Sequence, residues 1–477
     1  SMIQNAPLYP LTYLSVIFSP SIGINLSICL NFILAGTFMF LLIKKITGDD
    51  LSGFVSGIIF ALGGFSITCV FLGHITIINS IPYLPGVFWC LFNLNETLKI
   101  RWSAGIGLLL SLQFFGGQPQ FVFYTIFVLI LYFVFTFISQ KKKIKYIILF
   151  CFSIIFFGAV IYPYFQDVFE FAKLTVRSDS MGDYNFYTYW SFEPKKILVS
   201  IMPFFYGSSI DGDYWRIFWR KLTGFEGYNA YLSVTAVFLI FISFFKEKNQ
   251  TKKFFMFLMP FALIISLGKY TPIYKFFHFY VPGFNKFRWP VRFMYIYMFS
   301  AAVLAGIGIS TLKDIINEGK TTQYAKIKKI IIITAIISIA ITACLYLFNN
   351  QITDFFKIKI KQKIVDKGGI NYNSPEFYYN ASYKIFNTVK TSFLKFSLTT
   401  VLISLFTIFF KKFGKNAVCI PLAFLCAAEL SSVHLKFLKT TDNNFCAISE
   451  SVHSEFENDY RIFSDSDWYP PGINVLF

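Results

Sequence analysis

The sequence predicts an all-α integral membrane protein with about twelve transmembrane helices and long loops on the outer side. Three observations predict this fold class. The chain is 55% hydrophobic and 21% aromatic, with only 14% charged residues, and its mean hydropathy is +0.58. Apolar runs near the length of a bilayer span recur along all 477 residues. Basic residues gather in alternate short connections between these runs.

Each predicted span is an apolar segment bounded by polar or basic residues. Two of them, 103–116 and 254–267, are short enough to indicate broken or tilted helices. If all of them cross the membrane, both ends of the chain lie on the same side. In chain order, the segments are 22–43, 51–72, 78–95, 103–116, 120–139, 146–164, 229–245, 254–267, 291–312, 330–348, 392–410 and 416–434.

The spans divide the chain into transmembrane modules and outer loops. Both ends look cut, so 1–21 is interpreted as the remnant of a first outer loop and 436–477 as a truncated outer tail. The regions between them are an N-terminal transmembrane module (22–164), an outer loop or lid (165–228), a second transmembrane module (229–348), another outer loop (349–391) and the last two spans (392–435).

Lysine and arginine indicate which loops are cytoplasmic. The connections after alternate spans are basic, as shown by Lys44 with Lys45, by the run 141–145, and by 246–253. The positive-inside rule places these loops in the cytoplasm, so the termini and the longer loops face outward. Much of the net charge of +18 is thus explained by topology, and we expect no nucleic-acid partner.

Signatures of soluble catalysis and of metal binding are missing. All cysteines except Cys446 fall in apolar segments, which excludes a disulfide framework. The sequence has no CxxC, HExxH, P-loop, GxGxxG or GxSxG motif, and its four histidines are scattered. We therefore expect neither a metal site nor a bound cofactor.

The outer loops carry candidate acids beside aromatic residues. Glu193 lies near Trp190 and Asp213 near Trp215, and aromatic rings beside polar groups suit sugar binding. The other acids of this loop are expected to be solvated. In 352–366, apolar residues alternate with lysines, which suggests a strand or a segment lying along the membrane surface.

The stretch 281–308 changes from a cationic loop to an apolar helix within a few residues. Pro290 suits the first helical position, and Arg288 and Arg292 flank the helix start. Positive side chains are disfavoured at the positive end of a helix dipole unless an anion is present. Two interpretations are open. The arginines bind a phosphate, or they anchor the helix at the headgroup level.

Other polar residues are predicted at the outward ends of spans. His74 follows the second span, and Gln118 and Gln120 flank Pro119 at the start of the fifth. Together with the arginines, they would form a cradle for a phosphate at the membrane surface. Alternatively, His74 is a headgroup-level residue and GGQPQ an ordinary helical turn. Intramembrane Asn25 and Asn31 are interpreted as interhelical hydrogen-bonding residues.

Several segments give the chain a resemblance to the YfhO-like bacterial membrane proteins. They occur in the family's order and cover most of the chain: NAPLYPLTYL (5–14), GGFSITCVFLGH (63–74), GGQPQFVFY (116–124), EPKKILVSIMPFFYG (193–207) and NKFRWPVRFMYIYMFSAAVLAGIGI (285–309). FRWPVRF and GGQPQ are the most specific of them. Gln118 departs from the histidine expected at its position, which counts against a proton-carrying role there.

That family is similar to the GT-C glycosyltransferases, and the resemblance implies an activity. The chain would transfer a sugar from a polyprenyl-phosphate carrier to a cell-envelope glycan or polymer acceptor, outside the cytoplasmic membrane of a bacterium. It also implies a catalytic carboxylate in the first outer loop, which would precede Ser1. Within the sequence, the weaker catalytic candidates are His74, Glu193 and Asp213; Arg288, Arg292, Gln118 and Gln120 would bind the carrier phosphate.

Two alternative functions remain open. A transporter or lipid flippase can also use many spans, but it usually places its ionisable groups near mid-membrane. Here the polar groups crowd the outer ends of the spans, which favours chemistry at the surface. A polysaccharide polymerase shares the topology and the carrier lipid, and differs only in releasing chains rather than adding single sugars.

Overall fold

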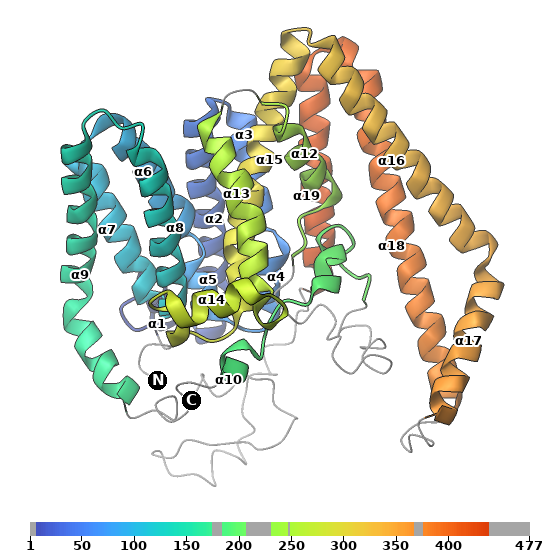
Figure 1. The fold of residues 1–477 in the computed structure, drawn as a ribbon, viewed down its shortest axis with the longest axis horizontal. Helices are drawn as coiled ribbons and strands as arrows, with labels where there is room; N and C mark the ends of the chain where they lie inside the picture. Colours follow the sequence, from blue (N-terminus) through green and yellow to red (C-terminus); the bar gives the residue numbers. More distant parts are fainter. Residues whose placement is uncertain (1–5, 174–183, 207–229, 247–248, 367–374, 438–477) are drawn as a thin grey trace. The chain divides into compact units, whose positions relative to one another are not determined.

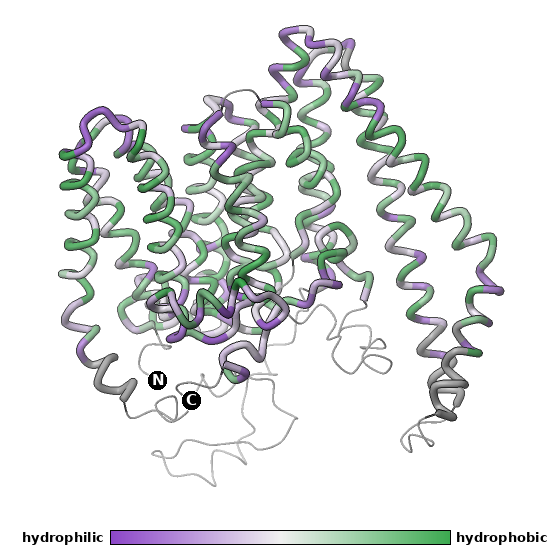
Figure 2. Tube along the Cα trace, viewed as in Figure 1, coloured by the Kyte–Doolittle hydropathy of each residue, from purple (hydrophilic) through white to green (hydrophobic). Residues whose placement is uncertain are grey.

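The fold is helical throughout the part of the chain that the structure describes. The structure is a computed structural model that describes residues 6–173, 184–206, 230–246, 249–366 and 375–437 (Figure 1). Within these ranges there is no strand, and nine helical segments are long and apolar enough to cross a membrane. Figure 2 shows hydrophobic residues along the middle of the long helices and hydrophilic residues near their ends. The prediction of an all-α polytopic membrane protein is confirmed.

Three of the predicted spans correspond to shorter helices. At a rise of about 1.5 Å per residue, a ten-residue helix covers only about 15 Å of a hydrocarbon core about 30 Å thick. The number of complete crossings therefore stays a prediction. The three helices are α7 (Ile100–Phe115, 16 residues), α12 (Val234–Ser243, 10 residues) and α13 (Gln250–Ser266, 17 residues).

The chain divides into two compact units. The first consists of Ser1–Leu42, Cys69–Gly182 and His434–Phe477, and the second of Ile43–Thr68 and Asp183–Val433. In the first unit, α7 packs against α6, α8 and α9. A Cβ at Gly107 of α7 would lie 2.8 Å from the Ser153 carbonyl oxygen of α9, so glycine allows this close approach. The main helices of this unit are α2 (Pro20–Thr47), α5 (Ile75–Ser80), α6 (Tyr83–Thr97), α7, α8 (Pro119–Phe137) and α9 (Lys143–Lys173).

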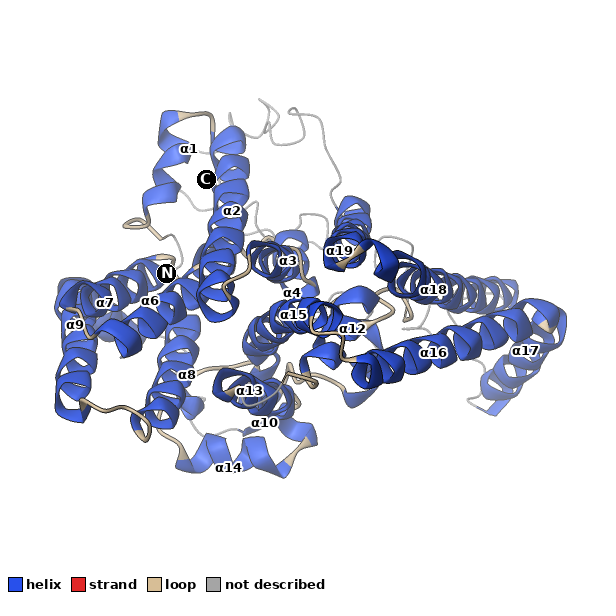
Figure 3. Cartoon of the chain, turned by 90° about the horizontal axis from the view of Figure 1, so that it is seen from above, coloured by secondary structure: helices blue, strands red, loops and turns tan. Residues whose placement is uncertain are grey.

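Helix α15 (Met294–Asn317) is the central helix of the second unit. It packs against α3 (Asp50–Ala61), α12 and α13, which surround it in Figure 3. Its apolar window is entirely buried inside the protein. Two glycines permit this packing: a Cβ at Gly306 would meet Ser52 and Ser56 of α3, and one at Gly308 would lie 2.0 Å from the Leu239 carbonyl oxygen of α12.

A non-helical segment precedes α12 in the interior of the second unit. Its residues Tyr231, Leu232 and Ser233 are almost fully buried. The Leu232 N–H donates to the Ser200 carbonyl (3.0 Å), and the Gly64 N–H donates to the Tyr231 carbonyl (2.9 Å). Non-helical backbone is tolerated in a membrane protein where the protein itself satisfies its polar groups. The break explains why α12 is short.

Two long helices, α16 (Thr321–Leu347) and α18 (Pro375–Phe409), pack along each other through hydroxyl pairs. Ser338 contacts Thr400 at 3.0 Å, and Thr342 contacts Ser397 at 2.8 Å between hydroxyl oxygens. The alternating segment 352–366 lies in a helix, α17 (Asn349–Asp366), so the strand interpretation is wrong. Helix α17 packs on α18 and places lysines and acids at helical spacing, as in the Lys357–Asp354 ion pair (3.1 Å).

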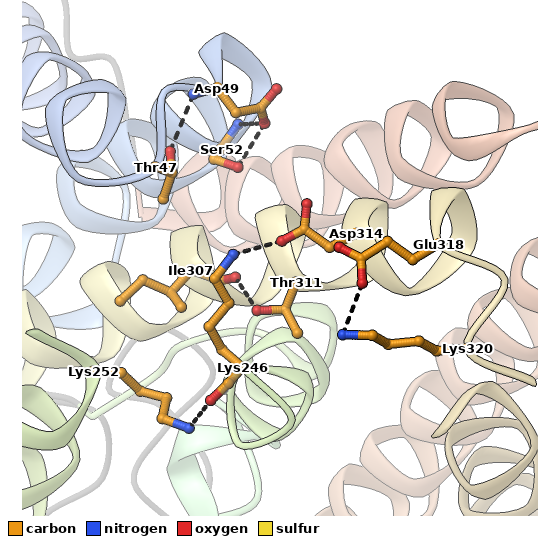
Figure 4. A network of polar contacts seen from close by, with 10 residues as sticks. All are labelled: Thr47, Asp49, Ser52, Lys246, Lys252, Ile307, Thr311, Asp314, Glu318 and Lys320. Carbon is orange, nitrogen blue, oxygen red and sulfur yellow. Dashed lines mark hydrogen bonds and ion pairs between the residues drawn. The ribbon is translucent and has the colours of Figure 1, made fainter. Parts of the chain in front are cut away.

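Two ion pairs join the connections between helices at one end of the second unit. Lys313 pairs with Asp49 at 2.6 Å and Lys246 with Asp314 at 2.5 Å; Figure 4 shows the second pair and its neighbours. Burial alone would raise the pKa of Asp49, but hydrogen bonds from Lys313 and Ser52 outweigh it and hold the pKa below its ordinary value. These ion pairs bring together the connections after three alternate predicted spans, 22–43, 229–245 and 291–312, as the basic-residue pattern predicts. Which side of the membrane they face stays a prediction.

Candidate functional site: an arginine and aromatic cluster at the start of α15

The arginine turn, residues 287–292, leads into α15 at the end opposite the ion pairs. Pro290 occupies the first position of a 3₁₀ helix, Pro290–Phe293, that continues into α15, which confirms the predicted helix start. Arg288 precedes this start and Arg292 lies in its first turn. Trp289 between them adopts a left-handed conformation with φ +68°. Such a φ is uncommon for a bulky residue and persists only where the surroundings hold it.

Backbone hydrogen bonds to the segment 187–192 hold the turn. The Trp289 N–H donates to the Tyr187 carbonyl (2.9 Å), and the Val291 N–H donates to the Trp190 carbonyl (3.3 Å). The same segment is joined to the end of α13, because the Phe192 N–H donates to the Ser266 carbonyl (2.8 Å). Three segments far apart in the sequence therefore form one structure at this end of the second unit.

Gly268 is required where these segments meet. Its φ is +52°, and a Cβ there would lie 2.2 Å from Ser191 Oγ and 2.9 Å from Pro290 Cγ. Ser191 Oγ also accepts a hydrogen bond from the Lys269 N–H at 3.1 Å. Only glycine fits both this conformation and this space.

Aromatic rings hold both arginine side chains. The guanidinium carbon of Arg292 lies 4.4 Å from the centre of the Trp289 ring, and that of Arg288 lies 5.4 Å from the same ring and 4.7 Å from Phe186. The ring of Trp190 lies 5.8 Å from that of Trp289. Two cations thus share one indole beside the positive end of a helix dipole. Their combined field favours a bound anion, and arginine can contact a phosphate through two N–H groups at once.

Glu193 lies in the segment that holds the arginine turn, where it precedes the short 3₁₀ helix Pro194–Ser200. It is half-buried. Its carboxylate acts on two phenols: burial first, and then the charge of Glu193, raises the pKa of Tyr206 and of Tyr270. The predicted role of Glu193 beside Trp190 in sugar binding stays a prediction. Asp213, the other acid predicted in this loop, lies outside the described residues.

His278 is a buried group that the sequence analysis did not single out. It lies in α14 (Pro272–Tyr280) with only 3% of its surface exposed. Its Nδ1 has no hydrogen-bond partner among the described residues. The rings of Tyr184 and Tyr187 each lie 5.3 Å from the imidazole. Burial lowers the pKa of His278. The only signal in the sequence is its position four residues after Tyr274, on the same face of α14.

The remaining predicted residues belong to the first unit. His74 and Gln118 each immediately precede a helix, α5 and α8, and neither side chain caps that helix. Gln120 is buried, and its Nε2 donates to the Tyr124 hydroxyl at 2.7 Å. The predicted cradle would combine these residues with arginines of the other unit. That combination stays a prediction.

A buried polar network also lies in the first unit. Asn31 Nδ2 donates to Asn79 Oδ1 (3.0 Å), and the Tyr9 hydroxyl donates to Asn31 Oδ1 (2.5 Å). The Tyr83 hydroxyl donates to that of Tyr9 at 3.1 Å. The interhelical role predicted for Asn31 is confirmed, whereas Asn25, for which the same role was predicted, is exposed. Because every bond joins groups of the chain itself, the network stabilises the unit.

Glu429 is an acid within a candidate span that the sequence analysis also missed. It lies in α19 (Lys415–Phe437) at the start of α12. Its carboxylate accepts hydrogen bonds from the Val234 N–H (3.0 Å), the Thr235 N–H (3.1 Å) and the Thr235 hydroxyl (2.5 Å). It therefore caps the short helix and satisfies donors that lipid would leave unpaired.

Neither metal-binding geometry nor similarity to known proteins adds an assignment. Among the described residues, no group of three or more His, Cys, Asp and Glu side chains is placed to hold a metal ion. Comparison of the chain with models of protein families, with curated proteins and with solved structures gives no match. The candidate site is thus the arginine turn, and Glu193 follows the segment whose backbone holds that turn.

Proposed function

We propose that this protein is a membrane glycosyltransferase, related to the YfhO-like and GT-C proteins, that moves a sugar from a polyprenyl-phosphate carrier to a cell-envelope acceptor. The observation that carries the proposal is the pair of guanidinium groups, each within 5.4 Å of the centre of the Trp289 ring at the start of α15. Such a cluster suits a phosphate at the membrane surface.

The proposed roles follow from the charges that change during transfer. As the bond between sugar and phosphate breaks, negative charge develops on the departing lipid phosphate. Arg288 and Arg292, with the positive end of α15, stabilise that charge. A carboxylate deprotonates the acceptor hydroxyl. Glu193 is our candidate for this base among the described residues, because its segment also holds the arginine turn. Aromatic rings around both groups suit stacking on a sugar.

The transporter alternative receives less support. Transporters place ionisable groups in the membrane interior, where substrate or ions reach them. Glu429 lies in a candidate span, but three donors of α12 already bind its carboxylate. A capped carboxylate of this kind is structural. The polymerase alternative uses the same site and carrier, and the length of the product distinguishes it.

Substitution of Arg292 tests the phosphate role. In an assay with purified lipid-linked sugar donor, we expect Arg292→Ala to lower the transfer rate about a hundredfold, on the order of 3 kcal/mol. Arg292→Lys should recover only part of this loss, because lysine cannot make the two-pronged contact.

The matched control is Lys286→Ala, which removes an exposed cation immediately before the turn. It should retain most of the activity. All variants must elute from size-exclusion chromatography in detergent as a single species. Full transfer by the Arg288→Ala, Arg292→Ala double variant would overturn the proposed phosphate site and leave the arginines as headgroup anchors.

A further inference from the structure

We infer that α14 is an interfacial helix that lies in the outer headgroup layer of the bilayer with its aromatic face inserted into lipid. Helix α14 follows α13 and packs against it and against the short helices η4 (Gly268–Tyr270) and η5 (Phe284–Lys286). Figures 1 and 3 both show α14 running across the direction of α13. A helix in this orientation follows the membrane plane if α13 crosses it.

The two sides of α14 differ sharply in burial. Tyr274 and His278 face the protein, with 2% and 3% of their surfaces exposed. The opposite side is apolar, and among the described residues it is largely exposed. Its members, spaced as one face of a helix, are Ile273, Phe276, Phe279 and Tyr280, which are exposed by 42%, 56%, 55% and 75%. A contiguous exposed aromatic face of this kind marks an interaction surface.

The charged residues around this face and the exposed surface of the neighbouring helix indicate that the face contacts lipid. Lys269, Lys275 and Lys286 precede, flank and follow the apolar face, and all three are exposed. Basic residues around an aromatic face match anionic headgroups above acyl chains. Phe257 of the adjoining α13 is also exposed, by 61%. Aromatic residues are enriched at this depth of the bilayer.

The buried side of α14 connects the membrane surface to the candidate site. Tyr187 contacts His278, and the carbonyl of the same Tyr187 accepts the hydrogen bond that holds Trp289. An inserted α14 therefore fixes the arginine turn near the level of lipid phosphates. This last step rests on the proposed function. The insertion of α14 itself does not.

Fluorescence at single positions of α14 tests the inference on the full-length protein. In a background without native cysteines, Phe276→Cys and Lys275→Cys are labelled with an environment-sensitive fluorophore. Each protein is reconstituted in vesicles of phosphatidylglycerol and phosphatidylethanolamine. We expect blue-shifted emission at 276, and quenching by lipid with a nitroxide near the top of its acyl chain about twofold or more stronger than at 275. Aqueous iodide should instead quench position 275 more strongly.

The outcomes separate lipid from other occupants. Emission at 276 that matches 275 and responds to iodide would show that water covers this face, and would overturn the inference. A label at 276 that neither iodide nor nitroxide lipid quenches would show that protein covers it, which also overturns the inference. If Phe276→Cys does not assemble, Phe279→Cys replaces it. Sugar transfer is not measured, so failure of the proposed function leaves these results intact.

Discussion

The buried imidazole of His278 makes the region around the candidate site sensitive to acid. Burial lowers its pKa from the ordinary value of 6.5. The unfolded chain therefore takes up a proton at a higher pH than the folded protein does. The stability that comes from a neutral His278 is fully present above the pKa of this residue in the unfolded chain. It is lost as the pH falls from that value toward the lower pKa of His278 in the folded protein.

We therefore expect the thermal unfolding midpoint in detergent to fall between pH 7.5 and pH 5.5, and to fall by less in His278→Phe. Phenylalanine preserves the aromatic packing with Tyr184 and Tyr187 and removes the titration. Differential scanning fluorimetry over this pH range measures the effect. An identical pH dependence in both proteins would show that His278 does not contribute.

The sequence was informative at residue scale wherever a local rule applied. Pro290 marks a helix start by its missing N–H, and the positions of Arg288 and Arg292 follow from it. The conformation of Trp289 was not predictable, because the carbonyl groups of a distant segment impose it. Glu429 was missed for the same reason: its three donors lie nearly two hundred residues away in the chain.

At the scale of elements, close packing against α15 limits the size of the side chains that its contact positions can carry. Gly308 brings the backbones of α15 and α12 into direct contact. We expect Gly308→Ala to force the two helices apart and to lower stability by about 1–3 kcal/mol, the usual cost of overpacking. Gly158→Ala in α9 is the matched control, because a Cβ there meets nothing within 4 Å. Thermal unfolding in detergent compares them, and equal midpoints would contradict the predicted contact.

Hydropathy located the helices well and their interruptions poorly. The long apolar runs became helical, since backbone groups in lipid must be satisfied within the segment, but the predicted spans 51–72 and 78–95 are each divided between two helices, α3 with α4 (Gly64–Phe71) and α5 with α6. The non-helical chain before α12 is as apolar as a helix, so only its tertiary hydrogen bonds distinguish it. In 352–366, alternation suggested a strand, but no neighbouring strand is present among the described residues and the segment is a helix on α18.

At the scale of the whole molecule, the orientation in the membrane decides whether the candidate site faces outward. Asn285 and Thr322 are exposed residues near opposite ends of α15. In a cysteine-free background, we expect a membrane-impermeant thiol reagent on intact cells to label Asn285→Cys and to spare Thr322→Cys. Permeabilised cells should show both labelled. Labelling of position 322 alone in intact cells would reverse the topology and place the arginine turn in the cytoplasm.

The buried non-helical segment before α12 also constrains how the protein is made. A helix satisfies its own backbone and enters lipid by itself, but the chain at Tyr231 and Leu232 relies on Gly64 and Ser200 for its hydrogen bonds. The first turn of α12 also depends on Glu429, which is added to the chain nearly two hundred residues later. The segment around α12 therefore completes its hydrogen bonds only after α19, which carries Glu429, has been synthesised. We accordingly expect the second unit to assemble after α19 is in place, rather than helix by helix as each one enters the membrane.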